Sequence, residues 1–459
     1  MRPALCPPRA AALVVLAAAL VACPIRAAGA AAADPTPMRR PDADGRTVTL
    51  GGAADRLPVY DTPYYVIHTD LPAIEVREIS LRMTRMAEEY HERTKEFSGA
   101  IRERMPFYVF SRDEDYHAAG GPKQSAGVAM GTRLMAIGGE RVTRSTWHVI
   151  QHEGFHQFVR AAIGGDIPVW MNEGLAEYFG EAEFTGTGYI AGVIPPRRLL
   201  GVQAAITARE FATLERMMKI THEEWSKELT GENYDQAWTM VHFLAHGDGG
   251  RYQPLFVAFM RQVSGGKPWQ RAWADTFRDT AGFEARWREW WLNLAPDATA
   301  EAFARVRVTA LANFLARAWA QKQTFATWDE FAAAAARREI KVGDADWLPP
   351  DLLTRVLTNA ERAGRWTLTP PPPGPAKRVQ LTLDTVDKTR VTAEFLPRAD
   401  GRAAPVEITV DALPRAIVDA KALAAAGKKP AARELLLDAI KKYPKSPALK
   451  DARQALTGL

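Results

Sequence analysis

The chain has 459 residues, which is long enough for two or three domains with cores of their own. Its hydrophobic fraction of 47% and charged fraction of 25% are ordinary for a globular protein. The net charge is only +5, and no dense run of Lys and Arg with interleaved aromatic residues occurs, so the sequence does not favour a nucleic-acid partner.

Residues 1–22 have the pattern of a secretory signal peptide. Arg2 and Arg9 precede an apolar core from Ala11 to Ala22, which at about twelve residues is too short to span a bilayer. The core is followed by Cys23, and Leu-Val-Ala-Cys resembles the bacterial lipobox, whose cysteine is lipidated and becomes the mature N-terminus. Cleavage in the small-residue run at residues 28–30 is the alternative. We expect an exported protein of the periplasm or cell envelope, with membrane attachment if Cys23 is lipidated.

Loss of this leader changes the charge and cysteine content. Without Arg2 and Arg9 the net charge falls from +5 to +3. Cys6 lies in the leader and Cys23 at its end, so the mature fold has no cysteine pair for a disulfide. Residues 23–58, rich in Ala, Pro and Asp, are predicted to be a flexible tether.

The next stretch combines helix and strand patterns. Apolar residues at three- and four-residue steps predict a helix over residues 74–98. Strands are predicted at Tyr64–His68, Met105–Phe110, Gly127–Met130 and Arg133–Ile137. Gly131-Thr132 joins the last two strands as a hairpin, and Thr143 or Ser145 is expected to cap the helix that follows.

That helix carries His-Glu-Gly-Phe-His at residues 152–156. On a helix, His152 and His156 share one face about 6 Å apart along the axis, which lets two imidazole nitrogens hold one zinc ion. Glu153 lies where a metalloprotease places its base. His148 would lie about 12 Å along the axis from His156, too far to share that ion, and is expected to act as a cap or to support a ligand.

A second acidic motif, Asn-Glu-Gly-Leu-Ala-Glu-Tyr, begins at Asn172. The short loop Gly164-Gly165-Asp166 and a helix started at Pro168 would bring Glu173 back as the third ligand. Glu177, one turn later, would accept a hydrogen bond from the other ring N–H of a ligating histidine. The alternative for both glutamates is a solvated pair on a helix surface.

Together these residues resemble the gluzincin peptidases of the thermolysin and aminopeptidase N type, and most closely the bacterial peptidase-MA-like domain. The shared pattern consists of His152, Glu153, His156, Trp170, Glu173, Gly174, Ala176, Glu177 and Tyr178. The resemblance covers about residues 60–294 and implies zinc held by His152, His156 and Glu173, with Glu153 as general base on a zinc-bound water. The gap between His156 and Glu173 is slightly shorter than in aminopeptidase N.

The resemblance also implies roles for a strand and a tyrosine. The strand nearest the zinc helix pairs with the extended substrate in that family, and Arg133–Ile137 is the expected counterpart, a plain edge strand being the alternative. Tyr234 corresponds to the tyrosine that donates a hydrogen bond to the developing oxyanion, and a core tyrosine is the alternative. His242 is a weaker candidate for this role and is expected to be structural. Helices of a zincin second half are predicted at 206–218, 238–246, 255–263 and 283–294.

Beyond residue 294 the resemblance ends. Residues 295–365 are predicted to be a helical linker region broken at Trp347-Leu-Pro-Pro, and residues 366–411 a small β region. A stiff proline-rich spacer starts at Pro370. Residues 412–459 resemble one tetratricopeptide helix pair, which must pack on a neighbour or bind a protein partner because one such unit cannot bury its own face.

The sequence therefore predicts an α+β fold with a zincin-like domain over residues 59–294. The expected function is an exported zinc metallopeptidase that hydrolyses a peptide or protein substrate, with Zn²⁺ as cofactor. Two alternatives stay open. One is a catalytically degenerate zincin that acts as a binding or assembly module, which the intact Glu153 disfavours. The other is a zinc hydrolase of a non-peptide amide, which the same metal site fits equally well.

Overall fold

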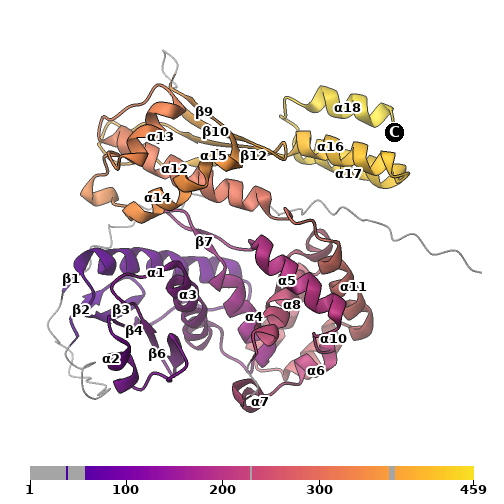
Figure 1. The fold of residues 1–459 in the computed structure, drawn as a ribbon. Coiled ribbons are helices and arrows are strands. Elements are labelled where there is room, and N and C mark those ends of the chain that lie inside the picture. Colours follow the sequence, from indigo (N-terminus) through magenta and orange to yellow (C-terminus); the bar gives the residue numbers. More distant parts are fainter. Residues whose placement is uncertain (1–37, 40–56, 228–229, 372–377) are drawn as a thin grey trace, which may run out of the picture.

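A computed structural model describes residues 38–39, 57–227, 230–371 and 378–459. The predicted signal peptide, Cys23 and nearly all of the tether lie outside these residues. Within them the chain has an α+β fold, with a six-stranded sheet, a four-stranded sheet, a two-stranded ribbon and many helices (Figure 1). Of the helices in this part of the chain, none combines the length and apolar character needed to cross a bilayer.

The six-stranded sheet forms the N-terminal half of the domain that the sequence analysis placed at residues 59–294. Its strands lie in the order β1-β2-β3-β4-β6-β5, with β3, β4 and β6 parallel and the others antiparallel to their neighbours. The bounds are β1 Met38–Arg39, β2 Val59–Asp61, β3 Tyr65–Thr69, β4 Met105–Phe110, β5 Gly127–Met130 and β6 Arg133–Ile137. Helices α1 (Ala73–Thr94) and α3 (Arg144–Phe158) share a core with one face, and α2 (Asp113–Ala118) packs on the other.

β5 lies at one edge of this sheet, and the prediction that Arg133–Ile137 is an edge strand open to a substrate is wrong. β6 has neighbours on both sides, because it pairs parallel with β4 and antiparallel with β5. The hairpin itself was predicted correctly. Alternation of apolar residues identifies strands but not their partners, and the order of the two strands follows from the long-range pairing of β6 with β4.

The second half of this domain is helical. A π-helical turn, η2 (Val159–Ile163), extends α3, and the ribbon of β7 (Glu183–Phe184) and β8 (Tyr189–Ile190) follows α4. Its helices are α4 Val169–Gly180, α5 Pro196–Ala208, α6 Leu214–Met218, α7 His222–Lys227, α8 Gly231–Gly250, α9 Gln253–Ser264, α10 Trp269–Thr276 and α11 Thr280–Asn293. The helix predicted over 206–218 is two helices, since the chain leaves α5 at Arg209 in a left-handed conformation and Thr213 caps α6.

The contact between α4 and α8 holds this half together. A Cβ atom at Gly174 would lie 2.4 Å from the carbonyl oxygen of Ala237, so only glycine allows the two helices to approach this closely. α8 is regular as far as His246 and kinks at Gly247–Gly249, where the backbone is not helical. This packing fixes the position of α4 relative to the residues on α8.

Residues 295–411 form one layered unit and not a linker followed by a separate β region. The helices are α12 Ala300–Ala320, α13 Trp328–Ala336, the 3-10 turn η3 Asp344–Asp346, α14 Pro350–Thr358 and α15 Ala360–Ala363. The antiparallel sheet has the order β12-β11-β10-β9, from β9 Gly364–Thr369, β10 Val379–Thr385, β11 Arg390–Phe395 and β12 Glu407–Asp411. α12 packs on β10 and β11, and their apolar side chains share one core.

Three helices end the chain: α16 Leu413–Ala425, α17 Lys429–Lys442 and α18 Leu449–Thr457. They have a core of their own and lie beyond the four-stranded sheet (Figure 1). The predicted helix pair corresponds to α16 and α17. The structure adds α18, which packs on both and buries Ala452.

Candidate metal centre

Helix α3 is held rigidly where it carries the two histidines. The side chain of Thr143 accepts a hydrogen bond from the amide of Thr146, which confirms one of the two predicted caps. Gln151 is buried, and its amide nitrogen lies 3.0 to 3.1 Å from the carbonyl oxygens of Phe179, Gly180 and Ala182 at the end of α4. These contacts fix α3 against α4, the helix that carries the two glutamates.

Three predicted ligands meet at one point between α3 and α4. The Nε2 atoms of His152 and His156 lie 3.1 Å apart. Oε2 of Glu173 lies 3.3 Å from each of them. The three donor atoms therefore form a nearly equilateral triangle, built from residues that are buried or half-buried.

The size of this triangle fits zinc. In a tetrahedral site with bonds of about 2.0 to 2.1 Å, neighbouring donor atoms lie about 3.3 Å apart. The observed sides are 3.1, 3.3 and 3.3 Å. Two imidazole nitrogens and one carboxylate oxygen are also a donor set that catalytic zinc uses. His152, His156 and Glu173 are thus the residues that would hold the ion, and the fourth tetrahedral position would be left for a further ligand.

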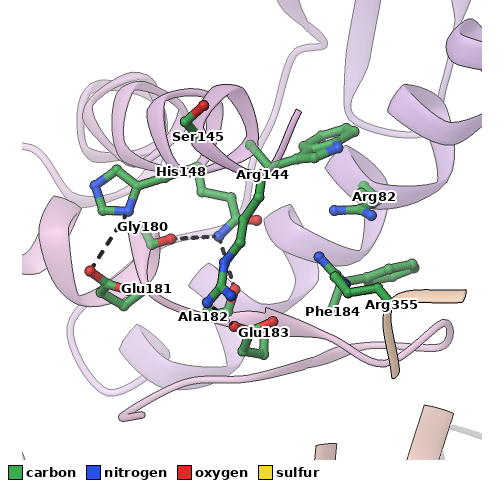
Figure 2. A pocket seen from close by; sticks show the side chains of 12 residues that line it. Arg82, Arg144, Ser145, His148, Gly180, Glu181, Ala182, Glu183, Phe184 and Arg355 are labelled. Carbon is green, nitrogen blue, oxygen red and sulfur yellow. Dashed lines mark hydrogen bonds and ion pairs between the residues drawn. The ribbon is translucent and has the colours of Figure 1, made fainter. Parts of the chain in front are cut away.

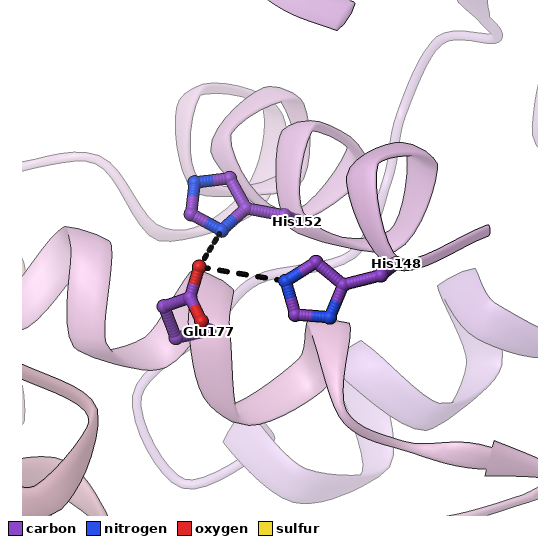
Figure 3. A group of neighbouring side chains, drawn as sticks. All are labelled: His148, His152 and Glu177. Carbon is purple, nitrogen blue, oxygen red and sulfur yellow. Dashed lines mark ion pairs between the residues drawn. The ribbon is translucent and has the colours of Figure 1, made fainter. Parts of the chain in front are cut away.

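Glu177 lies where the sequence places it, beside His152. Its Oε1 atom is 3.0 Å from Nδ1 of His152 and 3.5 Å from Nε2 of His148, so it lies between the two rings (Figure 3). A carboxylate in this position fixes the ring orientation and leaves Nε2 free to bind metal. His148 accordingly supports the site and does not reach the triangle. The outer nitrogen of His156 has no hydrogen-bond partner among the described residues.

Arg198 on α5 is a residue that the sequence analysis missed. Its guanidinium lies 2.6 Å from Glu177 and 2.6 Å from Glu181, and its Nε lies 2.8 Å from Asp235. It also stacks 4.1 Å above the ring of Trp238. Neither its spacing nor its neighbours in the sequence distinguish it, because the three carboxylates come from α4, the end of α4 and α8.

The charges around the triangle favour a cation. Burial acts to raise the pKa of Glu173, but the charge of His156 and the hydrogen bonds of both histidines lower it below its ordinary value. Burial opposes a charge on His152, yet its hydrogen bonds to Glu173 and Glu177 raise its pKa well above the usual range. Burial acts to raise the pKa of Glu177, but hydrogen bonds from His148 and His152 lower it well below its ordinary value, so two ionised carboxylates face the two imidazoles.

Glu153 reaches the strand at the edge of the sheet. Its Oε2 accepts a hydrogen bond of 2.8 Å from the backbone N–H of Ala129 on β5. β5 approaches α3 closely here, since a Cβ atom on Gly127 would lie 2.5 Å from Val149. The predicted base thus lies on the same helix as the two histidines and in contact with the edge strand β5.

Tyr234 is brought to the site, whereas His242 is not. The ring centre of Tyr234 lies 5.9 Å from that of His152. Burial, followed by the negative charge of Glu173, raises the pKa of Tyr234 to about 12, which keeps its phenol protonated at neutral pH. His242 is buried among aromatic rings, with Nε2 3.2 Å from the carbonyl oxygen of Gly192, and is a core residue as expected.

A family model described as a protein of unknown function (DUF1570) matches residues 147–270. This segment includes every residue of the triangle together with Glu153, Glu177 and Tyr234. No curated protein matches the chain. Because the matched family has no assigned activity, the function has to be argued from the chemistry of the site.

Proposed function

We propose that this protein is a zinc-dependent peptidase of gluzincin type. The observation that carries the proposal is the triangle of His152, His156 and Glu173, whose sides of 3.1 to 3.3 Å match those of a tetrahedral zinc site. The same triangle with Glu153 beside it is the arrangement expected for hydrolysis and not for a purely structural ion, which would have four protein ligands.

Zinc, when bound, would supply a Lewis acid that makes a water molecule a strong nucleophile near neutral pH. Glu153 would take a proton from the attacking water and return it to the departing amine. The N–H of Ala129 holds the carboxylate of Glu153 in one position, 2.8 Å away. Glu177 and Arg198 would keep the ring of His152 in the orientation that the site requires.

The position of β5 at the edge of the sheet, next to Glu153, supports a peptide as the substrate. The outward-facing N–H and carbonyl oxygen of Ala129 bond to Glu153 and Arg160 at 2.8 and 3.2 Å, so a peptide that pairs with this strand would replace side-chain contacts. An extended chain that pairs with an exposed edge gains backbone hydrogen bonds that do not depend on its side chains. A peptide bound along β5 would pass Glu153. A non-peptide amide has no extended backbone that could pair with this strand.

Tyr234 would act on the oxygen of the carbonyl under attack. Its phenol stays protonated at neutral pH because burial and Glu173 raise its pKa to about 12. A donor fixed near the metal ligands before the reaction stabilises the negative charge that develops on this oxygen. The position of its ring, 5.9 Å from that of His152, is compatible with this role.

We also propose that the protein is exported and acts in the periplasm or cell envelope. The support is the pattern of residues 1–22 and the Leu-Val-Ala-Cys23 motif. Mass spectrometry of the mature N-terminus tests this. A diacylated Cys23 would place the enzyme at a membrane surface, and a free N-terminus near Ala31 would replace the lipoprotein by a secreted protein.

The peptidase proposal is tested by incubating the purified protein with a mixed peptide library and identifying the new termini by mass spectrometry. We expect cleavage that disappears with a chelator, returns with zinc and is absent in Glu153→Gln. Cleavage that persists in Glu153→Gln or in the chelator would come from another enzyme or mechanism. An intact library after zinc loading would contradict the peptidase assignment.

A further inference from the structure

A pocket of about 380 Å³ lies beside the metal helix and is lined by three arginines from distant parts of the chain. Arg82 comes from α1, Arg144 from the start of α3, and Arg355 from α14 in the C-terminal layered unit. Figure 2 shows Arg144 crossing the pocket, with Arg82 and Arg355 together on one side. The volume exceeds that of an inorganic ion and falls in the range of small-molecule sites.

Two of the three arginines have carboxylate partners. Arg82 is ion-paired with Glu78 at 2.7 Å, and its guanidinium is stacked between the rings of Trp147 and Phe184 at 4.4 and 4.9 Å. Arg144 pairs with Glu183. Glu181, also at the pocket, is engaged by Arg198 at 2.6 Å. The carboxylates nearest the pocket are therefore already matched to other cations.

Arg355 has no ion-pair partner among the described residues. One of its terminal nitrogens, Nη2, is buried and has no hydrogen-bond partner among the described residues. Burial lowers the pKa of Arg355, and the charges of Arg82 and Arg144 lower it further, while Glu183 and Glu78 act in the opposite direction. A buried guanidinium next to two other cations is costly unless an anion joins it.

The pocket does not belong to the proposed catalytic cleft. Arg144, Trp147 and Gln151 follow at steps of three and four residues and so share one face of α3. Glu153, two residues beyond Gln151, faces about 200° around the helix axis. A ligand in the pocket would contact neither the base nor the metal triangle, although His148 at the pocket also touches Glu177.

We propose that this pocket binds a small organic carboxylate through Arg355. The unmatched charge is that of one guanidinium, whose planar fork fits one carboxylate group. A phosphate dianion would bring a second negative charge close to Glu181 and Glu183. The ligand would join α14 to α1 and α3, and the loop before α3 already contacts α14 through the ion pair of Arg141 with Asp351.

Calorimetric titration of the purified protein with benzoate tests the proposal. We expect benzoate to bind, benzamide (its neutral counterpart) to bind at least tenfold more weakly, and inorganic phosphate to bind more weakly than benzoate. Arg355→Met should weaken benzoate binding at least tenfold. The exposed Arg365→Met is the matched control and should bind as the parent does. Removing the metal with a chelator should leave benzoate binding unchanged, so the outcome is independent of the peptidase proposal.

Arg355→Met should keep or raise the thermal midpoint because it removes a buried charge, and Arg355→Lys should bind benzoate with intermediate strength. Equal binding to the parent and to Arg355→Met, or no benzoate binding, would overturn the site. Tighter binding of phosphate than of benzoate would overturn the carboxylate assignment.

Discussion

The molecule contains two histidine pairs with the same spacing and opposite properties. His152 and His156 lie on α3 with ring centres 4.8 Å apart, and His242 and His246 lie on α8 with ring centres 4.7 Å apart. The first pair meets Glu173 on α4. The second meets Tyr178, whose hydroxyl lies 2.9 Å from Nε2 of His246.

The pKa values follow these surroundings. Hydrogen bonds to carboxylates raise the pKa of His152 well above its ordinary value, although burial opposes this. Burial lowers the pKa of His242 to about 4 and that of His246 well below its usual range. A spacing of four residues therefore does not make a metal site, and the carboxylates supplied by a second helix decide which pair can hold a cation.

The largest expected effect is on turnover, through Glu153. Glu153→Gln removes the proposed base while leaving all three ligands, so turnover should fall by about a thousandfold with metal content unchanged. Peptide cleavage is the measurement, with the exposed Glu140→Gln as control. A Gln variant that cleaves at the parental rate would remove Glu153 from the chemistry.

The second histidine pair should make the folded protein less stable in acid. The pKa of His242 is about 4 in the folded chain and 6.5 is its ordinary value, so both states are neutral above pH 6.5 and the full stability is present there. As the pH falls toward 4, the unfolded chain binds a proton that the folded chain excludes, and about 3 kcal/mol of unfolding free energy is lost.

His242→Gln can still donate to the carbonyl of Gly192 but does not titrate, so it should reduce this acid loss. Urea unfolding of metal-free protein at about pH 7 and about pH 4.5 measures it. The exposed His222→Gln should behave as the parent, and an unchanged acid loss in His242→Gln would mean that His242 is not the group that titrates.

Tyr234 should affect the rate and not the metal. Tyr234→Phe keeps the ring near His152 but loses the donor, so kcat should fall about a hundredfold while KM changes little. Steady-state kinetics with a peptide substrate give both constants, and Tyr252→Phe serves as control. If KM rises and kcat stays the same, Tyr234 contributes to binding alone.

Glu177 should have the smallest effect, on metal affinity. Glu177→Gln can still accept the hydrogen bond of His152 but loses the charge, so zinc should bind about tenfold more weakly. Competition with a chelating dye measures this affinity. Unchanged affinity would show that the geometry of the triangle suffices without the carboxylate.

The sequence predicted the local parts of the site and missed its long-range parts. His152 and His156 were identified because helical spacing dictates which side chains share a face, and Glu173 because a short loop returns the next helix to them. Arg198 was not, because its three carboxylate partners are brought together only by the packing of α4, α5 and α8. Arg355, in the region predicted to be a linker, was missed for the same reason.

The fold also shows that strands are easier to predict than their order in a sheet. The bounds of β4 and β6 were predicted correctly, but β6 was expected at the edge where β5 lies. Alternating apolar residues do not show that β6 pairs with β4. β9 was not predicted, and its sequence Gly-Arg-Trp-Thr-Leu-Thr becomes a strand by pairing with β10. Its contacts with α13 and α15 likewise are known only from the packed structure.

The most direct test of the account is the zinc content of four purified proteins, measured by inductively coupled plasma mass spectrometry after zinc loading and desalting. We expect one zinc per chain in the parent and in His242→Gln, and loss of most of it in Glu173→Ala and His156→Ala. Full zinc occupancy in Glu173→Ala, or loss of zinc in a correctly folded His242→Gln, would contradict the assignment of the metal centre to α3 and α4.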